Sequence, residues 1–440
     1  MKLPEYVLDC LDTLENAGFS AYVVGGCVRD ACLGLAPQDF DMCTSALPEQ
    51  MVAAFAGRKL VLAGQKHGTV GVVTDGGVVE ITTYRMEGTY GDNRHPDWVR
   101  FVDAVDADLA RRDFTVNAMA YSPKRGFCDP FGGRKDLENG VLRAVGDPVQ
   151  RFREDSLRIL RGVRFAVRYG LAVDAETGRA MASEAHLMEN LARERVYGEL
   201  CGLLPLAGAR DLVRFGPILA AVIPELKPLL GFDQRSPHHA YDLYTHVAHV
   251  TAGVPRDLTL RWAALLHDTG KIPTFTVDET GRGHFYGHAS AGAEIADRVL
   301  RRLKAPTALR EQVVLLIGKH MTRLEPDRKI LRRWIGRLGW ETVEQLLALQ
   351  EADMGSKGTG RPEEMEQFAR IREVLAQIRQ EDACLTLKDL AVNGHDLMTL
   401  GITGKQLGAT LNALLEQVMD EELPNEKKPL LEAAKNYVNQ

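Results

Sequence analysis

The stretch from Ala21 to Thr44, AYVVGGCVRDACLGLAPQDFDMCT, decides the fold that we expect for this chain. Its first four residues have the length and β-branched content of a buried strand, and Gly25-Gly26 ends that strand where a helix can begin. Glycines let backbone N–H groups approach an anion closely, and the start of a helix carries partial positive charge. Arg29 follows about one turn later as a bidentate phosphate donor. The junction therefore predicts a triphosphate site.

Two acids follow in the segment Asp39-Phe40-Asp41. In extended backbone, Asp39 and Asp41 would lie on one face of a strand, with Phe40 on the opposite, core-facing side. Two such carboxylates repel each other unless a cation lies between them, and Mg²⁺ prefers oxygen ligands. The pair therefore predicts a magnesium site for phosphoryl displacement.

The order and spacing of these residues resemble a known signature, GGxVRDxxLG followed by DxD. It is the signature of the nucleotidyltransferase superfamily, to which the tRNA CCA-adding enzymes and bacterial poly(A) polymerases belong. The matching segments are Gly25 to Asp30, Leu33-Gly34 and Asp39 to Asp41. The chain resembles the CCA-adding class of bacteria and eukaryotes over nearly its whole length. The resemblance implies Mg²⁺-dependent nucleotidyl transfer from CTP and ATP to tRNA.

Composition limits the alternatives. With 440 residues and 45% hydrophobic content, the chain is long enough for two to four domains. No stretch approaches the roughly 20 apolar residues of a membrane span, and the acid-bearing N-terminus is unlike a signal peptide. Seven cysteines without CxxC pairs favour free thiols in the cytoplasm. The net charge of −6 means that RNA contacts must come from local basic patches. The sequence carries no signal that defines an oligomeric state.

The β pattern returns between Leu60 and Arg85, after a first helix expected at residues 5 to 18. Its turn signal at Asp75 to Gly77 predicts a hairpin. Glu80 lies among apolar residues of the second strand, where an unpaired carboxylate is costly to bury. Glu80 is therefore either a third metal-facing acid or a rim glutamate with an ion-pair partner.

A loop and a basic motif follow the hairpin. The segment from Met86 to Pro96, MEGTYGDNRHP, has the composition of a mobile loop. In the CCA-adding family a flexible loop at this place is associated with the switch from C to A addition, which disfavours a CC-only enzyme. The RRD motif Arg111-Arg112-Asp113, together with Asn117, resembles the second motif of the family, which holds the sugar and phosphates of the incoming nucleotide.

The segment from Arg151 to Tyr169 has an apolar stripe at helical spacing and six arginines elsewhere. We expect one helix, on which Glu154, Asp155 and Arg158 project together from one face. An Asp acceptor beside an Arg donor matches the pairing edges of cytosine and adenine, whereas uracil and guanine present the reverse order. A wrong base would leave buried polar groups unpaired at roughly 1 to 3 kcal/mol each.

The same three residues fit the EDxxR template motif of the family. Residue chemistry and resemblance therefore agree on C and A as substrates. Arg161 and Arg164 on this segment are further candidates for nucleotide or RNA-backbone contacts, beside the simpler role of solubilising the helix.

From about Gly231 the pattern is almost entirely helical, and its histidines include the motif LLHDTGK. This resembles the HD-domain metal phosphohydrolases, and imidazole with carboxylate suits a divalent transition metal or magnesium. A second divalent metal is therefore expected here, with His284 and His288 competing for one position. A relic HD fold that only supports RNA is the alternative. The candidate ligands are His246, His267, Asp268, His288, His320 and Asp353.

The expected fold class is multidomain α/β plus all-α, with a small mixed sheet in the head. We expect a nucleotidyltransferase head at 1–145, a helical neck at 146–230, an HD metal domain at 231–355 and a helical RNA-binding tail at 356–440. The glycine-punctuated turn Gly401 to Lys405 would hold a backbone phosphate in the tail. Gly355 to Gly360 would be a flexible connection.

Two rival functions predict different observations. A poly(A) polymerase usually shows an arginine-rich strand after its carboxylates, and this chain has LVLAGQKHGTVGVV there instead. A non-catalytic RNA-binding protein would incorporate no nucleotide at all, and the intact pair Asp39 and Asp41 disfavours it.

Overall fold

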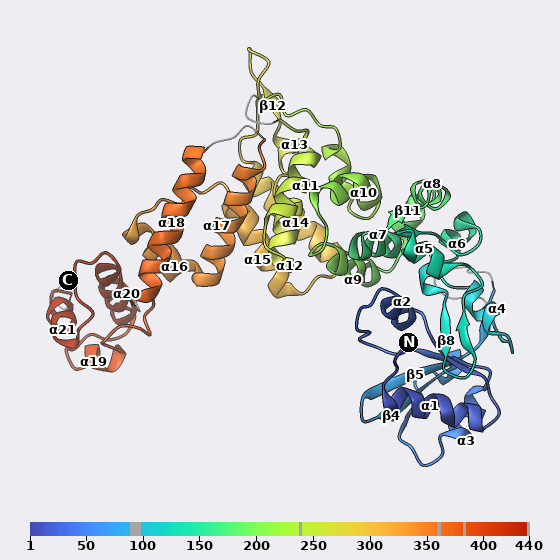
Figure 1. Cartoon of the computed structure of the whole chain (residues 1–440). Coiled ribbons are helices and arrows are strands. Elements are labelled where there is room, and N and C mark those ends of the chain that lie inside the picture. Colours follow the sequence, from blue (N-terminus) through green and yellow to red (C-terminus); the bar gives the residue numbers. More distant parts are fainter. Residues whose placement is uncertain (89–97, 237–239, 359–361, 382–383, 438–440) are drawn as a thin grey trace. The chain divides into compact units, whose positions relative to one another are not determined.

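The computed structural model describes residues 1–88, 98–236, 240–358, 362–381 and 384–437 (Figure 1). The chain forms two compact units. One contains Met1–Ala207 with Arg214–Lys227, and the other contains Gly208–Val213 with Pro228–Gln440. The four predicted domain boundaries stay a prediction. The predicted loop from Met86 to Pro96 falls largely on residues 89–97, outside the described residues.

The first unit is built on a seven-stranded mixed sheet with the order β3-β4-β5-β2-β1-β8-β9. Strand β2 pairs in parallel with β5, and every other neighbouring pair is antiparallel. The small mixed sheet expected for the head is thereby confirmed. The strands are β1 (Ala21–Val24), β2 (Met42–Thr44), β3 (Leu60–Val61), β4 (Thr69–Thr74), β5 (Gly77–Thr83), β8 (Ala120–Ser122) and β9 (Gly126–Cys128).

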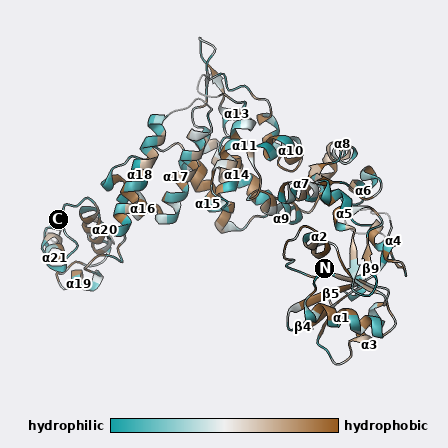
Figure 2. Ribbon diagram, in the orientation of Figure 1, coloured by the Kyte–Doolittle hydropathy of each residue, from teal (hydrophilic) through white to brown (hydrophobic). Residues whose placement is uncertain are grey.

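The predicted hairpin is strands β4 and β5, joined by Asp75 and Gly76. Val79 and Ile81 are buried while Val78 and Glu80 are exposed, so β5 has one core face and one outer face. The strong brown colour of this region in Figure 2 reflects the many valines of the hairpin. Glu80 is therefore not a buried carboxylate in need of a partner.

Short helices cover the sheet. The expected first helix is α1, and it buries Val7, Leu11 and Leu14 at helical spacing. The helices of this region are α1 (Glu5–Asn16), α2 (Gly26–Cys32), α3 (Pro48–Ala54), α4 (Val105–Ala110) and α5 (Gly133–Glu138), with the 3₁₀ segments η1 (Gln65–His67) and η2 (Thr115–Asn117) and the strand pair β6 (Arg85–Glu87) and β7 (Val99–Phe101).

The predicted single helix from Arg151 to Tyr169 is wrong, because the structure breaks it in two. Helix α6 (Pro148–Glu154) ends before Asp155, whose backbone is extended, and α7 (Leu157–Tyr169) begins after Ser156. The Asp155 carboxylate accepts a hydrogen bond from the backbone N–H of Leu157 at 3.1 Å. This local bond competes with helical geometry, as short polar side chains do.

The rest of the first unit is mainly helical. It contains β10 (Val141–Leu142), β11 (Ala172–Val173), α8 (Ala175–Ser183), η3 (Ala185–Asn190), α9 (Arg193–Leu203) and most of α10 (Ala209–Val222). The short segment η4 (Pro224–Leu229) follows.

The second unit is almost entirely helical, as expected, apart from the pair β12 (Thr276–Val277) and β13 (Gly283–His284). Figure 2 shows that hydrophilic residues dominate α18. The helices are α11 (Leu243–Gly253), α12 (Leu258–Leu266), α13 (Lys271–Thr274), α14 (His288–Arg302), α15 (Thr307–Lys319), α16 (Arg328–Leu338), α17 (Trp340–Gly355), α18 (Pro362–Gln380), α19 (Gly394–Met398), α20 (Lys405–Met419) and α21 (Lys427–Lys435).

The C-terminal helices have their own small hydrophobic core, which includes Leu397, Ile402, Leu414 and Leu430. The predicted turn into a helix is present, because Gly404 caps α20 with a φ of 61°. Helix α17 ends at Gly355, and the expected connection to Gly360 runs partly outside the described residues. Among the described helices, none combines the length and the apolar composition needed to cross a bilayer.

Candidate functional site

The acids of the head meet at the start of β2. Asp39 and Asp41 do not lie in a strand as predicted, because β2 begins only at Met42. The backbone carbonyl of Asp41 nevertheless accepts a hydrogen bond from Val24 at 2.9 Å, which extends the ladder by one residue. Met42 of β2 pairs with Ile81 of the parallel strand β5, so Asp41, one residue before β2, lies near Glu80 of β5. Phe40 packs edge-on against Tyr6, with ring centroids 6.3 Å apart.

The electrostatics of Asp41 reflect this arrangement. Surrounding protein atoms partly desolvate its carboxylate and raise its pKa, although the residue is exposed. The charges of Glu80 and Asp39 raise the pKa further, and Arg112 opposes them. Such mutual repulsion fits a divalent cation among the three carboxylates. Among the described residues, these acids do not form a group whose oxygens all lie within 4.8 Å of one another.

The glycine turn has the geometry expected of it. Gly25 precedes α2 with φ 77° and ψ −125°, a conformation that is essentially restricted to glycine. A Cβ at Gly25 would lie 2.8 Å from Nη1 of Arg112, while one at Gly26 would meet Nη2 of Arg29 at 3.5 Å. A side chain at Gly25 would therefore be strained by the positive φ and would require the guanidinium of Arg112 to shift.

Arg112 belongs to the motif predicted to hold the sugar and phosphates of the nucleotide, and its position supports that role. Its guanidinium lies beside Gly25 and influences Asp41, and it is held by a long ion pair of 3.5 Å to Asp108. Arg111 forms a closer pair with the same Asp108 at 2.9 Å. Both belong to the basic pair of the RRD motif, so sequence could locate the pair without deciding which member faces the glycine turn.

Arg29 is more enclosed than a phosphate donor needs to be. Its guanidinium donates to Oδ1 of Asn117 and to the hydroxyl of Tyr169, both at 2.5 Å, and pairs with Asp30 at 2.7 Å. The ring of Tyr169 also lies under it, 4.4 Å from centroid to Cζ. Arg29 thus ties α2 to η2 and α7. Its role as a phosphate donor stays a prediction, one that requires the guanidinium to leave these partners.

Asp113 is the centre of a buried network. Its carboxylate accepts hydrogen bonds from the side chains of Asn117 at 3.0 Å and Arg161 at 2.9 Å. Burial raises the pKa of Asp113, but the charge of Arg161 and the Asn117 bond overcome it and lower the pKa to about 2. Glu199 extends the network, 3.8 Å from Arg161 and 2.6 Å from Arg164. This network joins the second motif to α7 and α9.

Only two of the three predicted base-reading residues come together, Glu154 and Arg158. The broken helix turns Asp155 toward Arg195, which donates to it at 2.6 Å. Arg158 instead pairs with Glu154 at 2.7 Å and donates to the backbone carbonyl of Arg111 at 3.1 Å. A common face for Glu154, Asp155 and Arg158 is therefore wrong for this structure.

A small cavity of about 160 Å³ lies next to that pair. Glu154 and Arg111 line it together with Arg151 and Gln150, and Met86 closes one side. Glu154 and Arg111 thus border the same cavity. Asp155 and Arg158 are not part of its wall.

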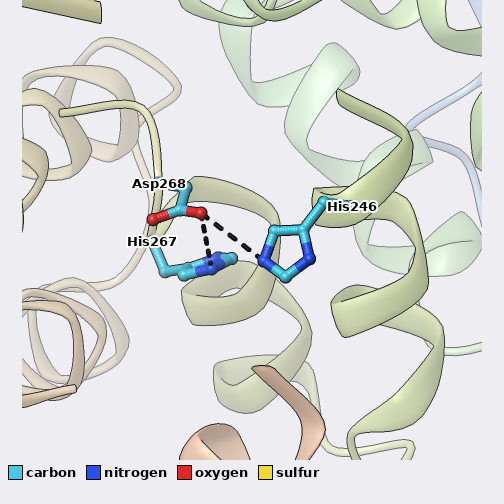
Figure 3. Close-up of side chains that lie close together, drawn as sticks. All are labelled: His246, His267 and Asp268. Atoms are coloured by element: carbon cyan, nitrogen blue, oxygen red, sulfur yellow. Dashed lines mark ion pairs between the residues drawn. The ribbon is translucent and has the colours of Figure 1, made fainter. Parts of the chain in front are cut away.

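The predicted metal ligands of the second unit converge. His246, His267 and Asp268 offer ligand atoms that all lie within 4.8 Å of one another (Figure 3). The same is true of Asp268, His288 and His320. Asp353 joins them, with Oδ1 3.0 Å from Nε2 of His246. Asp268 is common to both groups. All six candidates therefore surround one region.

The histidines are oriented by their outer nitrogens. In each ring Nδ1 lies within hydrogen-bond distance of a backbone carbonyl, so that Nδ1–H donates and Nε2 carries the lone pair that faces the cluster. Nε2 of His267 is buried and makes no hydrogen bond among the described residues. This orientation fits a divalent metal, because imidazole nitrogen and carboxylate oxygen are suitable ligands. The carbonyls belong to Ser356 for His246, Ala264 for His267, Phe285 for His288 and Ile317 for His320.

The choice between His284 and His288 is decided by position. His284 lies on the β12–β13 pair and forms an exposed ion pair with Asp278 at 2.7 Å. His288 begins α14, and its Nε2 lies 3.3 Å from Nε2 of His320. His288 therefore belongs to the cluster and His284 does not.

Lys271, the lysine of the HDTGK segment, is the cation of this region that sequence did not single out as a site residue. Its Nζ lies 2.8 Å from the carboxylate of Asp268 and 2.9 Å from Oε1 of Gln234. The charge of His267 and then that of Lys271 lower the pKa of Asp268 well below its ordinary value, against the effect of burial. Asp268 is thus held as a carboxylate.

Two family models match the chain. Residues 21–143 match the poly A polymerase head domain, and residues 285–434 match a putative second domain of tRNA nucleotidyltransferases. The solved CCA-adding enzyme of Bacillus stearothermophilus in complex with CTP superposes with a TM-score of 0.68 at 28% identity, covering 100% of this chain and 98% of that one. The Thermotoga maritima CCA-adding enzyme complexed with tRNA shares the fold, with a TM-score of 0.64 at 20% identity over 99% of this chain and 96% of that one.

Curated relatives agree over nearly the full length. The CCA-adding enzyme of Levilactobacillus brevis is 35% identical over 432 residues, covering 96% of this chain and 95% of the relative. That of Lactiplantibacillus plantarum is 32% identical over 443 residues, covering 97% and 94%. Together with the mixed-sheet head, its glycine turn and its carboxylates, this similarity shows that the chain belongs to the family of CCA-adding enzymes, which are nucleotidyltransferases.

Proposed function

We propose that the head adds C, C and A to the 3′ end of tRNA from CTP and ATP and releases pyrophosphate. The observation that carries this proposal is the position of Asp41, which lies one residue before β2, near Glu80 of the parallel strand β5 and next to the turn at Gly25. Asp39, Asp41 and Glu80 would hold Mg²⁺. When bound, the ion would supply positive charge that stabilises the reacting phosphate and activates the tRNA hydroxyl.

The chain's own residues would orient the nucleotide. Gly25 permits close approach of the triphosphate to the backbone, and Arg112 stands beside that turn as a cation for its oxygens. Arg29, Asp113 and Asn117 would hold the turn against α7 through their buried hydrogen bonds. The 3′-oxygen of tRNA then bonds to the α-phosphorus while the bond to pyrophosphate breaks.

Base selection remains assigned to Glu154, Asp155 and Arg158. In the arrangement described above, Glu154 and Arg111 border the small cavity, whereas Asp155 and Arg158 are held by other partners. A nucleotide would therefore have to release Asp155 from Arg195, or Arg158 from Glu154, before both can meet a base. The pattern of donor and acceptor is the support for C and A over U and G.

The test uses purified full chain with tRNA that ends before its CCA. Each nucleotide is offered separately and together, and the 3′ ends are sequenced. We expect CC from CTP alone and CCA from CTP with ATP. Runs of A longer than one would favour a poly(A) polymerase instead, and no incorporation would favour an RNA-binding protein without activity. The cytoplasmic location stays a prediction that rests on the free cysteines.

A second candidate activity is carried by the histidine cluster, whose four Nε2 atoms and two carboxylates face one region. We propose that it hydrolyses 3′-phosphate or 2′,3′-cyclic phosphate ends, which would restore the hydroxyl that the head needs. A divalent metal at the cluster would supply charge for the phosphate and lower the pKa of a water. The water oxygen bonds to phosphorus, the P–O bond to ribose breaks, and the water proton goes to the departing oxygen.

This activity is tested with the double substitution His267→Ala and Asp268→Ala in metal-supplemented protein. Hydrolysis of both kinds of phosphate end should be lost while CCA addition is kept, because the head has its own carboxylates. Chelated wild type is the control. If metal-loaded wild type hydrolyses neither end, the cluster is a structural relic and only the head activity stands.

A further inference from the structure

A cavity of about 290 Å³ opens beside the histidine cluster. His320 and Asp353 of the cluster form part of its wall, and the rest comes from α17, α18, the segment after α15 and Lys357, which follows α17. Its volume is at the lower end of the range for pockets that bind small molecules, which is about 300 to 1,000 Å³. A molecule in this cavity would therefore contact two of the candidate metal ligands directly.

Two cations line the cavity, Lys357 beside the cluster and Arg323, together with the acid Glu364. Lys357 Nζ lies 3.9 Å from Asp353 Oδ2, and its side chain is 18% exposed. Arg323, an exposed residue, donates to Oε1 of Gln367 at 3.3 Å. Both long side chains line the cavity, so an anion bound there would meet a guanidinium and an ammonium group.

The cavity also has an apolar surface, which a nucleobase would need. Phe368 of α18 and Met354 of α17 line the cavity and are both partly exposed. An aromatic ring and a thioether are suitable partners for the flat face of a nucleobase. The cavity thus combines phosphate-binding and base-stacking groups within one small space.

We propose that this cavity binds a nucleoside 3′-phosphate, with the phosphate between Lys357, Arg323 and the histidine cluster and the base against Phe368. The assignment of the cavity as a substrate site rests on the hydrolysis proposed above for the cluster. The same chemistry is presented by a free nucleotide and by the last nucleotide of an RNA that ends in a phosphate.

The binding is measured on the full chain in chelator, by methyl resonances of labelled methionine. Met354 lines the cavity, and Met365 of α18 does not, so it serves as the internal reference. The probes are adenosine 3′-monophosphate and glycerol 2-phosphate, which has no base. We expect only the nucleotide to shift the Met354 methyl strongly, because a stacked ring changes the local field.

Two variants separate the contributions. Phe368→Ala should weaken the binding of the nucleotide by about ten-fold and leave the binding of glycerol phosphate unchanged, since stacking on an aromatic side chain is worth roughly 1 to 3 kcal/mol. Arg323→Ala should weaken the binding of both ligands. Arg370→Ala is the matched control, because Arg370 is exposed on the same helix and pairs with Glu366 outside the cavity.

The outcomes distinguish the two proposals. An unshifted Met354 at millimolar nucleotide, or unchanged affinity in Phe368→Ala, would overturn the nucleotide site even if metal-loaded protein hydrolyses phosphate ends. A shifted Met354 in a protein without hydrolysis would support the site and overturn the hydrolase. Displacement of the nucleotide by tRNA that ends in a 3′-phosphate, but not by tRNA with a 3′-hydroxyl, would identify the RNA end as the source. Without displacement, the source is a free nucleotide.

Discussion

Replacement of Asp113 by Asn should destabilise the head by about 2 kcal/mol at neutral pH. The magnitude follows from the pKa of Asp113, which the Arg161 charge and the Asn117 bond lower from 3.8 to about 2 against the effect of burial. One pKa unit corresponds to about 1.4 kcal/mol of preference for the charged form. Asn keeps the oxygen that accepts from the backbone N–H of Phe114 and from the Asn117 amide. It replaces Oδ2, which accepts from Arg161, by an NH2 donor, so the charge and the hydrogen bond to Arg161 are lost together.

The pH dependence of this difference has a definite sign. Because the folded-state pKa is below the unfolded value, the stabilisation is complete above pH 3.8 and is lost as pH falls toward 2. The difference between wild type and Asp113→Asn should therefore fall to about half of its neutral value near pH 3.

The assay must report on the head alone, because unfolding of a chain with two units need not be two-state. Cys43 is buried in the hydrophobic core of the head, so its labelling by a thiol reagent in urea follows unfolding of that unit. Cys384 is buried in the second unit, so it should become labelled at the same urea concentration in the variant as in wild type. Peptide mass spectrometry separates the two signals.

The matched control is Asp12→Asn, which removes an exposed ion pair of 2.8 Å to Lys124 in the same unit. It should change stability by less than about 0.5 kcal/mol. The assignment of the stabilisation to the buried charge pair would be refuted in two cases. In the first, Asp113→Asn loses no more stability than the control; in the second, its loss of stability does not vary with pH.

Three further predictions concern the two sites. Asp41→Ala should abolish C and A addition alike in the sequencing assay while tRNA still binds, and retained incorporation would contradict the magnesium assignment. Gly25→Ala should raise the KM for CTP and ATP together, because positive φ strains alanine by roughly 1 to 3 kcal/mol and its Cβ would displace Arg112; an unchanged KM would argue against triphosphate binding at this turn. Gly270→Ala should reduce metal content, measured by mass spectrometry, and spare CCA addition, because its Cβ would lie 2.0 Å from the carbonyl oxygen of His288. Full metal content would show that His288 is not a ligand.

Local signals in the sequence predicted much of the fold. Strand β1 has the predicted bounds, the hairpin turns at Asp75 and Gly76, and α2 starts after the glycine with positive φ. These features depend on hydrophobic alternation and on the conformational freedom of glycine, both of which are properties of neighbouring residues.

The sequence identified the candidate functional residues by their type, but it did not identify their partners. The break between α6 and α7 arises from the local Asp155 bond and from long-range partners such as Arg195, 40 residues away in sequence. Helical periodicity alone gives no information about such partners. The prediction of one continuous helix failed for this reason.

The sequence by itself determined the family, the acids Asp39 and Asp41, the glycine turn and the residue types of the histidine cluster. Only the tertiary structure decided that His288 rather than His284 joins the cluster, that Arg112 faces the glycine turn, and that a cavity adjoins the cluster. The physical reason is that these outcomes depend on packing between segments far apart in the chain. The position of a side chain is set there by contacts that local spacing does not encode.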